Sequence, residues 1–165
     1  MLTVPKIAER GEQPYVAITA TIPMREIGPS AQSLLPEVFG WLAARGIRPA
    51  GAPFFRYVVI DMAHLLEIEF GVPTSGTVAG DGRVHSGVLP AGRYASLVHR
   101  GHYDELYDAN AVLIGWAKER GIRWDSAETP AGERFGCRIE TYFTDPREEP
   151  DPTKWETEVA IRIAD

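Results

Sequence analysis

The chain has 165 residues, of which 44% are hydrophobic and 24% are charged, so it can bury a core and is not intrinsically disordered. It carries 17 Lys and Arg against 23 Asp and Glu, a formal net charge of −6, without any run of basic residues. This balance argues against direct binding of nucleic acid or of a membrane, because both need a basic surface. No apolar stretch resembles a signal peptide or a membrane span, so we expect a soluble, cytoplasmic protein.

The first half of the chain predicts a strand, a helix and two more strands. Residues 15–22 are rich in β-branched residues, which is typical of a strand. Apolar residues at spacings of three and four then predict a helix from Ser33, its expected N-cap, to Arg45. Residues 54–60 and 65–72 predict the two strands that follow.

The second half predicts the same order of elements. Residues 94–98 predict a strand, and apolar residues at helical spacing predict a helix from Asp104 to Arg120. Residues 135–143 and 156–163 predict two more strands, which a rigid acidic loop separates.

The two halves also repeat in sequence. Residues 41–48 and 116–123 are identical at five of eight positions, and both include the Arg-Gly pair that ends a predicted helix. Glycine at that place can adopt the left-handed conformation that closes a helix. We therefore divide a single domain into a first repeat at about 14–73, a linker at about 74–83 and a second repeat at about 84–163.

These repeats predict an α+β fold made of duplicated β-α-β-β units related by a pseudo-twofold axis. Each unit would form one antiparallel sheet covered by one long helix, which gives two sheets in all. A central groove would lie between the halves, and such junctions are common places for ligand sites.

Acidic and aromatic residues gather on the predicted hairpins. Glu140 and Tyr142 alternate with their neighbours on one strand, so both side chains point to the same face. Glu158 lies on the next strand, just after Trp155, so this hairpin could bring two carboxylates and two aromatic rings onto one face. The matching hairpin of the first half offers Tyr57, Glu67 and Glu69.

A carboxylate in such a groove loses hydration, so it needs a hydrogen-bond donor or a cation as a partner. A tyrosine hydroxyl could donate to it. A ligand cation could also pair with it, because two charges at about 4 Å and an effective dielectric of about 20 attract by roughly 4 kcal/mol before desolvation. The alternative is that these glutamates are solvated residues of half-exposed strands, since exposed Glu is the norm.

The remaining reactive residues predict neither a metal site nor an activated thiol. His99 and His102 have a spacing that could suit a metal, but no set of cysteine or carboxylate ligands accompanies them, so we expect no metal and no cofactor. Cys137 lies on an apolar strand and is expected in the core. Trp41 and Trp116 belong to apolar helical stripes and are expected to pack on the sheet.

Four segments occur in a characteristic order. They are Leu89-Pro90-Ala91-Gly92-Arg93-Tyr94-Ala95, His99 to Leu106, Glu140-Thr141-Tyr142 followed by Asp145-Pro146, and Trp155 to Glu158. Together with the duplication, they resemble the GyrI-like (gyrase-inhibitor-like) effector-binding domains, over roughly residues 14–163. Such domains also form the ligand-sensing part of some bacterial multidrug-responsive transcription regulators.

This resemblance implies a central pocket in which aromatic side chains surround a buried glutamate, for bulky, lipophilic and often cationic compounds. The family glutamate corresponds to Glu140. The expected ligand-binding residues are Glu140, Tyr142, Glu158, Trp155, Tyr94, Tyr57 and Glu67. The chain has no room for a helix-turn-helix, so we expect a stand-alone member.

Three functions stay open at this point. The leading hypothesis is a small-molecule-binding protein for lipophilic cations, with Glu140 as the charge partner. The alternative is a hydrolase of cyclopropanoid or other electrophilic toxins, which some stand-alone family members resemble; Glu140 would activate water and Tyr142 would orient it. The third is an interaction protein that binds a protein partner, gyrase or a regulator, without a ligand.

Overall fold

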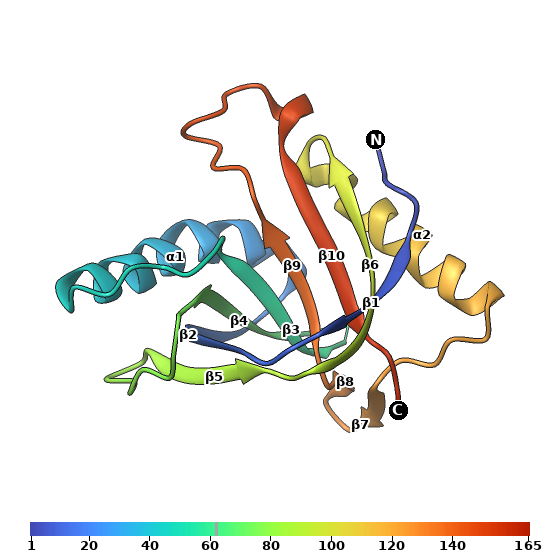
Figure 1. Ribbon diagram of the computed structural model, residues 1–165, viewed down its shortest axis with the longest axis horizontal. Helices are drawn as coiled ribbons and strands as arrows, with labels where there is room; N and C mark the ends of the chain where they lie inside the picture. The colour runs from blue at the N-terminus through green and yellow to red at the C-terminus, as the bar shows by residue number, and fades with distance from the viewer. Residues whose placement is uncertain (62) are drawn as a thin grey trace.

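The computed structural model describes residues 1–61 and 63–165, which form one antiparallel sheet with two α-helices (Figure 1). The α+β class is as predicted. The helices are α1 (Ile27–Ala44) and α2 (Leu106–Glu119), with short 3-10 helices at Met24–Glu26, Tyr103–Glu105 and Pro152–Lys154. The strands are β1 (Lys6–Arg10), β2 (Gln13–Ile22), β3 (Phe54–Ile60), β4 (Leu66–Pro73), β5 (His85–Leu89), β6 (Gly92–Arg100), β7 (Ser126–Thr129), β8 (Gly132–Phe135), β9 (Arg138–Tyr142) and β10 (Glu156–Arg162).

Hydrogen bonding orders eight of the strands as β1-β6-β10-β9-β3-β4-β2-β5, and the β7–β8 hairpin attaches to β3 through β8. The halves join where β3 pairs with β9, with Phe55 opposite Glu140. The prediction of two separate sheets is therefore wrong. The joint is favourable because β3 and β9 would otherwise each leave backbone N–H and C=O groups unpaired at an open edge.

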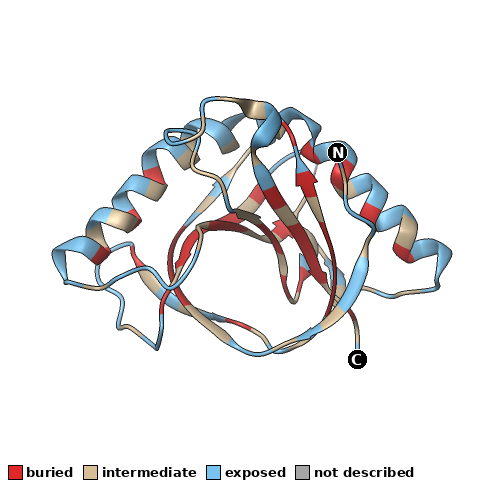
Figure 2. Ribbon diagram, turned by 45° about the horizontal axis from the view of Figure 1, so that its top comes forward, coloured by how far each residue is buried: buried red, intermediate tan, exposed pale blue. Residues whose placement is uncertain are grey.

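The first strand of each half pairs with the other half. β1 precedes β2 in the chain but pairs with β6, and β5 precedes β6 but pairs with β2. The sheet curls into an open ring with both helices on its outside (Figure 2). We call the outer side, which α1 and α2 cover, the helix face, and the side that lines the curl the inner face.

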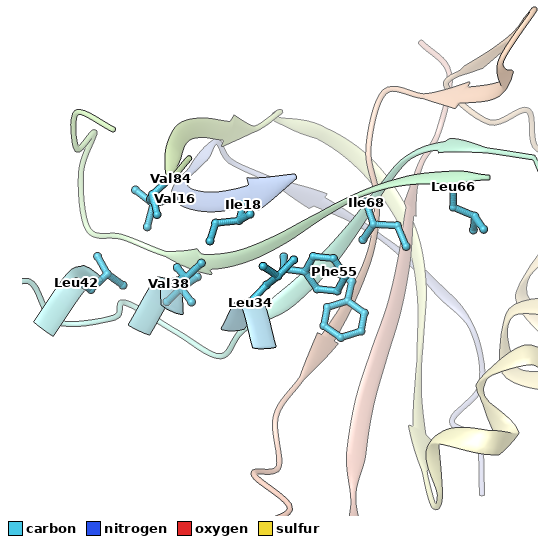
Figure 3. Packing of buried hydrophobic residues seen from close by; sticks show 11 residues of the cluster. Val16, Ile18, Leu34, Val38, Leu42, Phe55, Leu66, Ile68 and Val84 are labelled. Atoms are coloured by element: carbon cyan, nitrogen blue, oxygen red, sulfur yellow. The ribbon is translucent and has the colours of Figure 1, made fainter. Parts of the chain in front are cut away.

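Helix α1 packs across β2 and β4 on the helix face. Its buried residues Leu34, Val38 and Leu42 recur every four positions and lie against alternating strand residues (Figure 3). The buried strand partners are Val16, Ile18, Phe55, Leu66, Ile68, Phe70 and Val72. This stripe holds α1 on the sheet, since burying one such side chain contributes about 1.5–3 kcal/mol.

Helix α2 packs in the same way over β6 and β10, with Leu106, Ala109 and Leu113 buried. A third buried cluster fills the inner face. It consists of Tyr15, Ala17, Phe54, Leu89, Tyr94, Cys137, Ile139 and Ala160. Cys137 is therefore a core residue, as predicted. In the described part of the chain, no helix is both long and apolar enough to cross a membrane.

Both helices end in the same motif. Gly46 and Gly121 have φ angles of 67° and 65°, which confirms the predicted left-handed closures. The backbone N–H of the next residue, Ile47 or Ile122, donates to the carbonyl five residues earlier at 3.0 Å. The beginning of α1 differs from the prediction, because the helix starts at Ile27 and Ser33 lies within it.

The two tryptophans of the repeated segments also have matching surroundings. Trp41 and Trp116 are half-buried against the core cluster of their own half, as predicted. The guanidinium carbons of Arg45 and Arg120 lie 3.8 and 4.3 Å from the centres of these two rings. The repeated sequence therefore builds the same local structure twice.

Candidate ligand-binding site

Glu140 places a carboxylate in the middle of the sheet, on the helix face. In β9, Ile139 packs in the inner-face cluster, so alternation points the Glu140 and Tyr142 side chains to the opposite side. Strands β3 and β10 pair with β9 on its two edges. The Glu140 side chain can therefore point only towards the helices, and it is 5% exposed.

Three donors hold the Glu140 carboxylate. The hydroxyls of Tyr57 and Tyr142 donate to Oε1 at 2.5 and 2.9 Å, and Nδ2 of Asn110 on α2 donates to Oε2 at 3.0 Å. Burial, followed by the negative charge of Glu140, raises the pKa of both tyrosines well above 10, so they keep the protons that they donate. Tyr57 comes from the first half of the chain, so this carboxylate links the halves.

Arg138 extends the hydrogen-bond network. Its guanidinium donates to Oδ1 of Asn110 at 3.1 Å and lies 4.9 Å from the centre of the Phe135 ring. Asn110 thus lies between a carboxylate and a guanidinium, and it hydrogen-bonds to both.

A series of aromatic rings leads from the carboxylate to the surface. The Tyr142 ring lies 4.5 Å from that of Phe55 and 5.4 Å, edge to face, from that of Tyr103. The Tyr103 ring lies 4.6 Å from Trp155, and the exposed His102 stacks on Trp155 at 5.6 Å. Tyr142, Tyr103 and Trp155 are only half-buried, so part of each side chain is exposed to solvent.

The site lies where the two halves meet. Ile60 and Tyr142 each pack against both buried clusters of the helix face. Trp155 is fixed in place because its indole N–H donates at 2.7 Å to the carbonyl of Glu149, in the loop between β9 and β10. The aromatic surround is thus built from strand, helix and loop residues of both halves.

The predicted binding residues fall on both faces of the sheet. On the helix face, the structure brings together Glu140, Tyr142, Tyr57 and Trp155. On the inner face lie Glu158, Tyr94 and Glu67.

The expectation that Glu140 and Glu158 share a face is wrong. In the β9–β10 pair, Glu158 lies opposite Thr141, and Val159 lies opposite Glu140. Residues directly opposite each other point to the same face. The sequence shows the alternation within each strand but not the register between strands, and a shift of one residue exchanges the faces.

Charged side chains on the inner face have partners on the same face. Glu158 forms an ion pair with Arg10 at 2.9 Å, and Arg10 lies 5.2 Å from the centre of the Tyr94 ring. Glu69 is buried and accepts a hydrogen bond from the Tyr15 hydroxyl at 2.7 Å. A pocket of about 360 Å3 opens beside Arg10 and Glu158. Buried residues of the inner-face cluster line the floor of this pocket, and the Glu158 carboxylate is already paired with the Arg10 guanidinium. We therefore place the candidate site at Glu140.

His99 and His102, which have a spacing that could suit a metal, each contact neighbouring residues of the chain. His99 is buried, with Nε2 2.8 Å from a carboxylate oxygen of Glu105. His102 accepts a hydrogen bond from the backbone N–H of Asp104 and so caps the short helix before α2. Throughout the residues that the structure describes, no group of three or more His, Cys, Asp or Glu could hold a metal ion.

Sequence reasoning did not find Asn110, Arg138, Phe55 or Tyr103. A signal existed for Asn110, which lies four residues after Leu106 and three before Leu113 on the apolar stripe of α2. A polar residue in such a stripe needs a partner in the core, because burying an unpaired amide is costly. The other three gave no comparable signal.

The fold recurs in solved structures. The C-terminal domain of EcmrR superposes with a TM-score of 0.71 at 18% identity, over 98% of this chain and 97% of that one. A hydrolase from Listeria innocua gives 0.66 at 15% identity over 97% and 91%, and SAV2435 bound to tetraphenylphosphonium gives 0.63 at 8% over 98% and 94%. In the EcmrR–DNA complex, the chain spans 57% of the length of EcmrR, with a TM-score of 0.76 at 18% identity.

One curled antiparallel sheet with two helices on its outside thus defines the class, an α+β domain shared with these structures. The sequence model of the GyrI-like small molecule binding domain matches residues 3–164. The chain belongs to this GyrI-like family of small-molecule-binding domains. No curated protein matches it in sequence.

Proposed function

We propose that the chain binds bulky, lipophilic, cationic small molecules on the helix face of the sheet, with Glu140 as the charge partner. One observation carries this proposal: a carboxylate that is 5% exposed lies beside half-buried aromatic rings at the junction of the two halves. The chain belongs to a family of small-molecule-binding domains, in which such a carboxylate can pair with a cationic ligand.

A cation suits this site for two reasons. The Glu140 carboxylate has about four acceptor positions, of which three are filled by protein donors, so one remains for a ligand. The faces of Tyr103 and Trp155 can add a cation–π attraction of about 0.5–2 kcal/mol each when a ligand displaces water from them.

We also propose that the ligand lies in a central groove between duplicated halves related by a pseudo-twofold axis. The order β9-β10-β6 on one side of the central joint mirrors β3-β4-β2 on the other, which supports the duplication. The identical closures of α1 and α2 support it as well. Grooves at such junctions commonly hold ligands.

Tetraphenylphosphonium is a suitable probe, because SAV2435, which shares the fold, was solved with this lipophilic cation bound. We expect saturable binding to the present chain, followed by calorimetry or tryptophan fluorescence. Substitution Glu140→Gln keeps the shape of the side chain but removes its charge, so the affinity should fall at least about tenfold.

A matched control comes from the inner face. Glu158→Gln removes the same charge from a residue that points away from the site and pairs with Arg10. The affinity of this variant should stay within about twofold of the unmodified protein, because its charge is screened by the paired guanidinium. Equal losses in both variants, or no saturable binding at all, would count against the proposal.

A second candidate function is hydrolysis of a cyclopropanoid electrophile, in which water adds across the strained ring. The two tyrosine hydroxyls beside the Glu140 carboxylate favour it, because a carboxylate can act as base while a tyrosine orients water. The Listeria innocua neighbour described as a hydrolase also supports it. Product formation that Glu140→Gln abolishes would support the enzyme, and saturable binding without product would support the binder.

A further inference from the structure

Arg138 lies two residues before Glu140 on β9, so both side chains point to the helix face. Its guanidinium has a single protein acceptor among the described residues, Oδ1 of Asn110 at 3.1 Å, and it packs over the Phe135 ring. The site that holds a carboxylate therefore also holds a cation of the protein.

The orientation of the Asn110 amide is determined by its neighbours. Its Nδ2 donates to the backbone carbonyl of Leu106 at 2.8 Å and to Glu140 Oε2 at 3.0 Å, and neither of these oxygens can donate. Its Oδ1 is therefore the atom that faces Arg138. The amide bridges the carboxylate and the guanidinium, so the two opposite charges are neighbours without a direct ion pair.

The Arg138 guanidinium has donors to spare. Within the described part of the chain, no carboxylate oxygen lies close enough to form a salt bridge with it, and only one of its five N–H groups has a protein acceptor. Its other two nitrogens, Nε and Nη1, are not among the buried polar atoms that lack a partner, so both keep some contact with solvent. Burial lowers the pKa of Arg138 and the charge of Glu140 opposes that shift, but an arginine stays protonated.

We propose that Arg138 is a specificity-determining residue, which makes the site select lipophilic zwitterions, with an anionic group beside the cationic one, over bare monocations. This inference rests on the proposed function, because it requires ligand binding at Glu140. The cationic group of the ligand would lie against Glu140, and its anionic group would accept hydrogen bonds from Arg138.

Charge balance is the physical reason. Glu140 and Arg138 together are neutral, so a monocation leaves the half-buried site with an excess positive charge, whereas a zwitterion leaves it neutral. The spacing of two strand residues places the two groups about 7 Å apart. At that distance, and shielded from solvent, Arg138 still repels a cation bound to Glu140.

Rhodamine B and its ethyl ester test this inference, because they share one cationic, lipophilic body. At neutral pH rhodamine B also carries a carboxylate, and the ester does not. Fluorescence anisotropy should show that the protein prefers rhodamine B by about tenfold, as expected for one charge–charge contact in a partly buried site. In Arg138→Gln the preference should disappear or reverse, with tighter binding of the ester.

Arg138→Lys is the matched control, since it keeps the charge and should keep the preference for rhodamine B. Arg138→Met is a second neutral variant that preserves the apolar stem over Phe135, in case the glutamine variant folds poorly. The inference would be overturned if the ratio of the two dye affinities were the same in the unmodified protein, in both neutral variants and in the lysine variant.

Glu140→Gln separates the two proposals. If it weakens binding of both dyes while the Arg138 variants leave their ratio unchanged, the proposed function stands and the selectivity inference fails. If Glu140→Gln weakens the binding of neither dye, the proposed function itself fails.

Discussion

At the scale of single residues, the hydroxyl groups of Tyr57 and Tyr142 compensate the buried carboxylate of Glu140. Both donate to the same oxygen, Oε1, from different strands. Removing one donor leaves part of a buried charge without a partner, and that penalty exceeds the value of an ordinary hydrogen bond. The two tyrosines therefore serve stability as well as the proposed binding.

Tyr57→Phe and Tyr142→Phe should each lower the free energy of unfolding by about 1–3 kcal/mol, because each leaves a buried acceptor without one of its donors. Urea denaturation followed by circular dichroism measures this. Tyr107→Phe is the control, since Tyr107 is 67% exposed, and it should change stability by less than about 0.5 kcal/mol. Equal effects at all three positions would contradict the assigned hydrogen bonds.

At the scale of elements, two glycines determine how the helices end. Gly46 and Gly121 have positive φ angles, and an added Cβ would meet nothing within 4 Å at either position. The cost of a side chain there is thus conformational and not steric, and it should be the same for both helices.

Gly46→Ala and Gly121→Ala should each destabilise the protein by about 1 kcal/mol, because alanine adopts the left-handed conformation poorly. Gly40→Ala and Gly115→Ala are matched controls inside α1 and α2, where a Cβ also meets nothing within 4 Å. They should stabilise the protein by about 0.5–1 kcal/mol. Thermal unfolding of the four variants checks the opposite signs, and a common sign would refute the explanation.

Features of the elements that depend on local periodicity could be predicted from the sequence. Strands β2, β3, β4, β6, β9 and β10, the two helices apart from the start of α1, and both glycine closures follow from the spacing of apolar residues and the place of each Arg-Gly pair. Strands β1, β5, β7 and β8 were not predicted as separate strands, because they are short segments without a clear alternation of apolar and polar residues. The pairing of β3 with β9 could not be predicted, because it joins residues about 85 positions apart that carry no shared pattern. The prediction for the face of Glu158 was wrong for another reason, because the sequence does not show the register of β10 against β9.

The candidate site was predictable to a similar extent. Glu140 and Tyr142 share a strand, so their common face follows from alternation alone. Asn110 and Arg138 become neighbours only when α2 docks on the sheet. The place of Asn110 in an apolar stripe indicates that it needs a partner, but the sequence does not show that this partner is Arg138. The charge balance of the site therefore becomes visible only in the folded chain.

At the scale of the whole molecule, buried tyrosines make stability depend on alkaline pH. Burial is the largest cause that raises the pKa of Tyr15, Tyr57, Tyr94 and Tyr142 above the usual value. The folded chain then binds these protons more tightly than the unfolded chain does. This contribution to stability is complete below the pKa of an unfolded tyrosine, about 10, and is lost as the pH rises above it.

We expect the urea midpoint to fall between about pH 9 and about pH 11, on either side of the ordinary tyrosine pKa. Near-ultraviolet absorbance of the folded protein should show that at least these four of the six tyrosines stay protonated where those of the unfolded chain ionise. Ionisation of all six in the folded protein near pH 10 would contradict their burial.

The exchange of first strands between the halves makes the protein suitable for splitting into two pieces. A cut in the 74–83 connector would leave β1 on a fragment with α1, and β5 on a fragment with α2. The partners of these strands, β6 and β2, would then belong to the other fragment. Neither piece could complete its sheet alone, and Glu140 would be separated from Tyr57. The two pieces together would form a complementation pair that reports the encounter of whatever they are fused to.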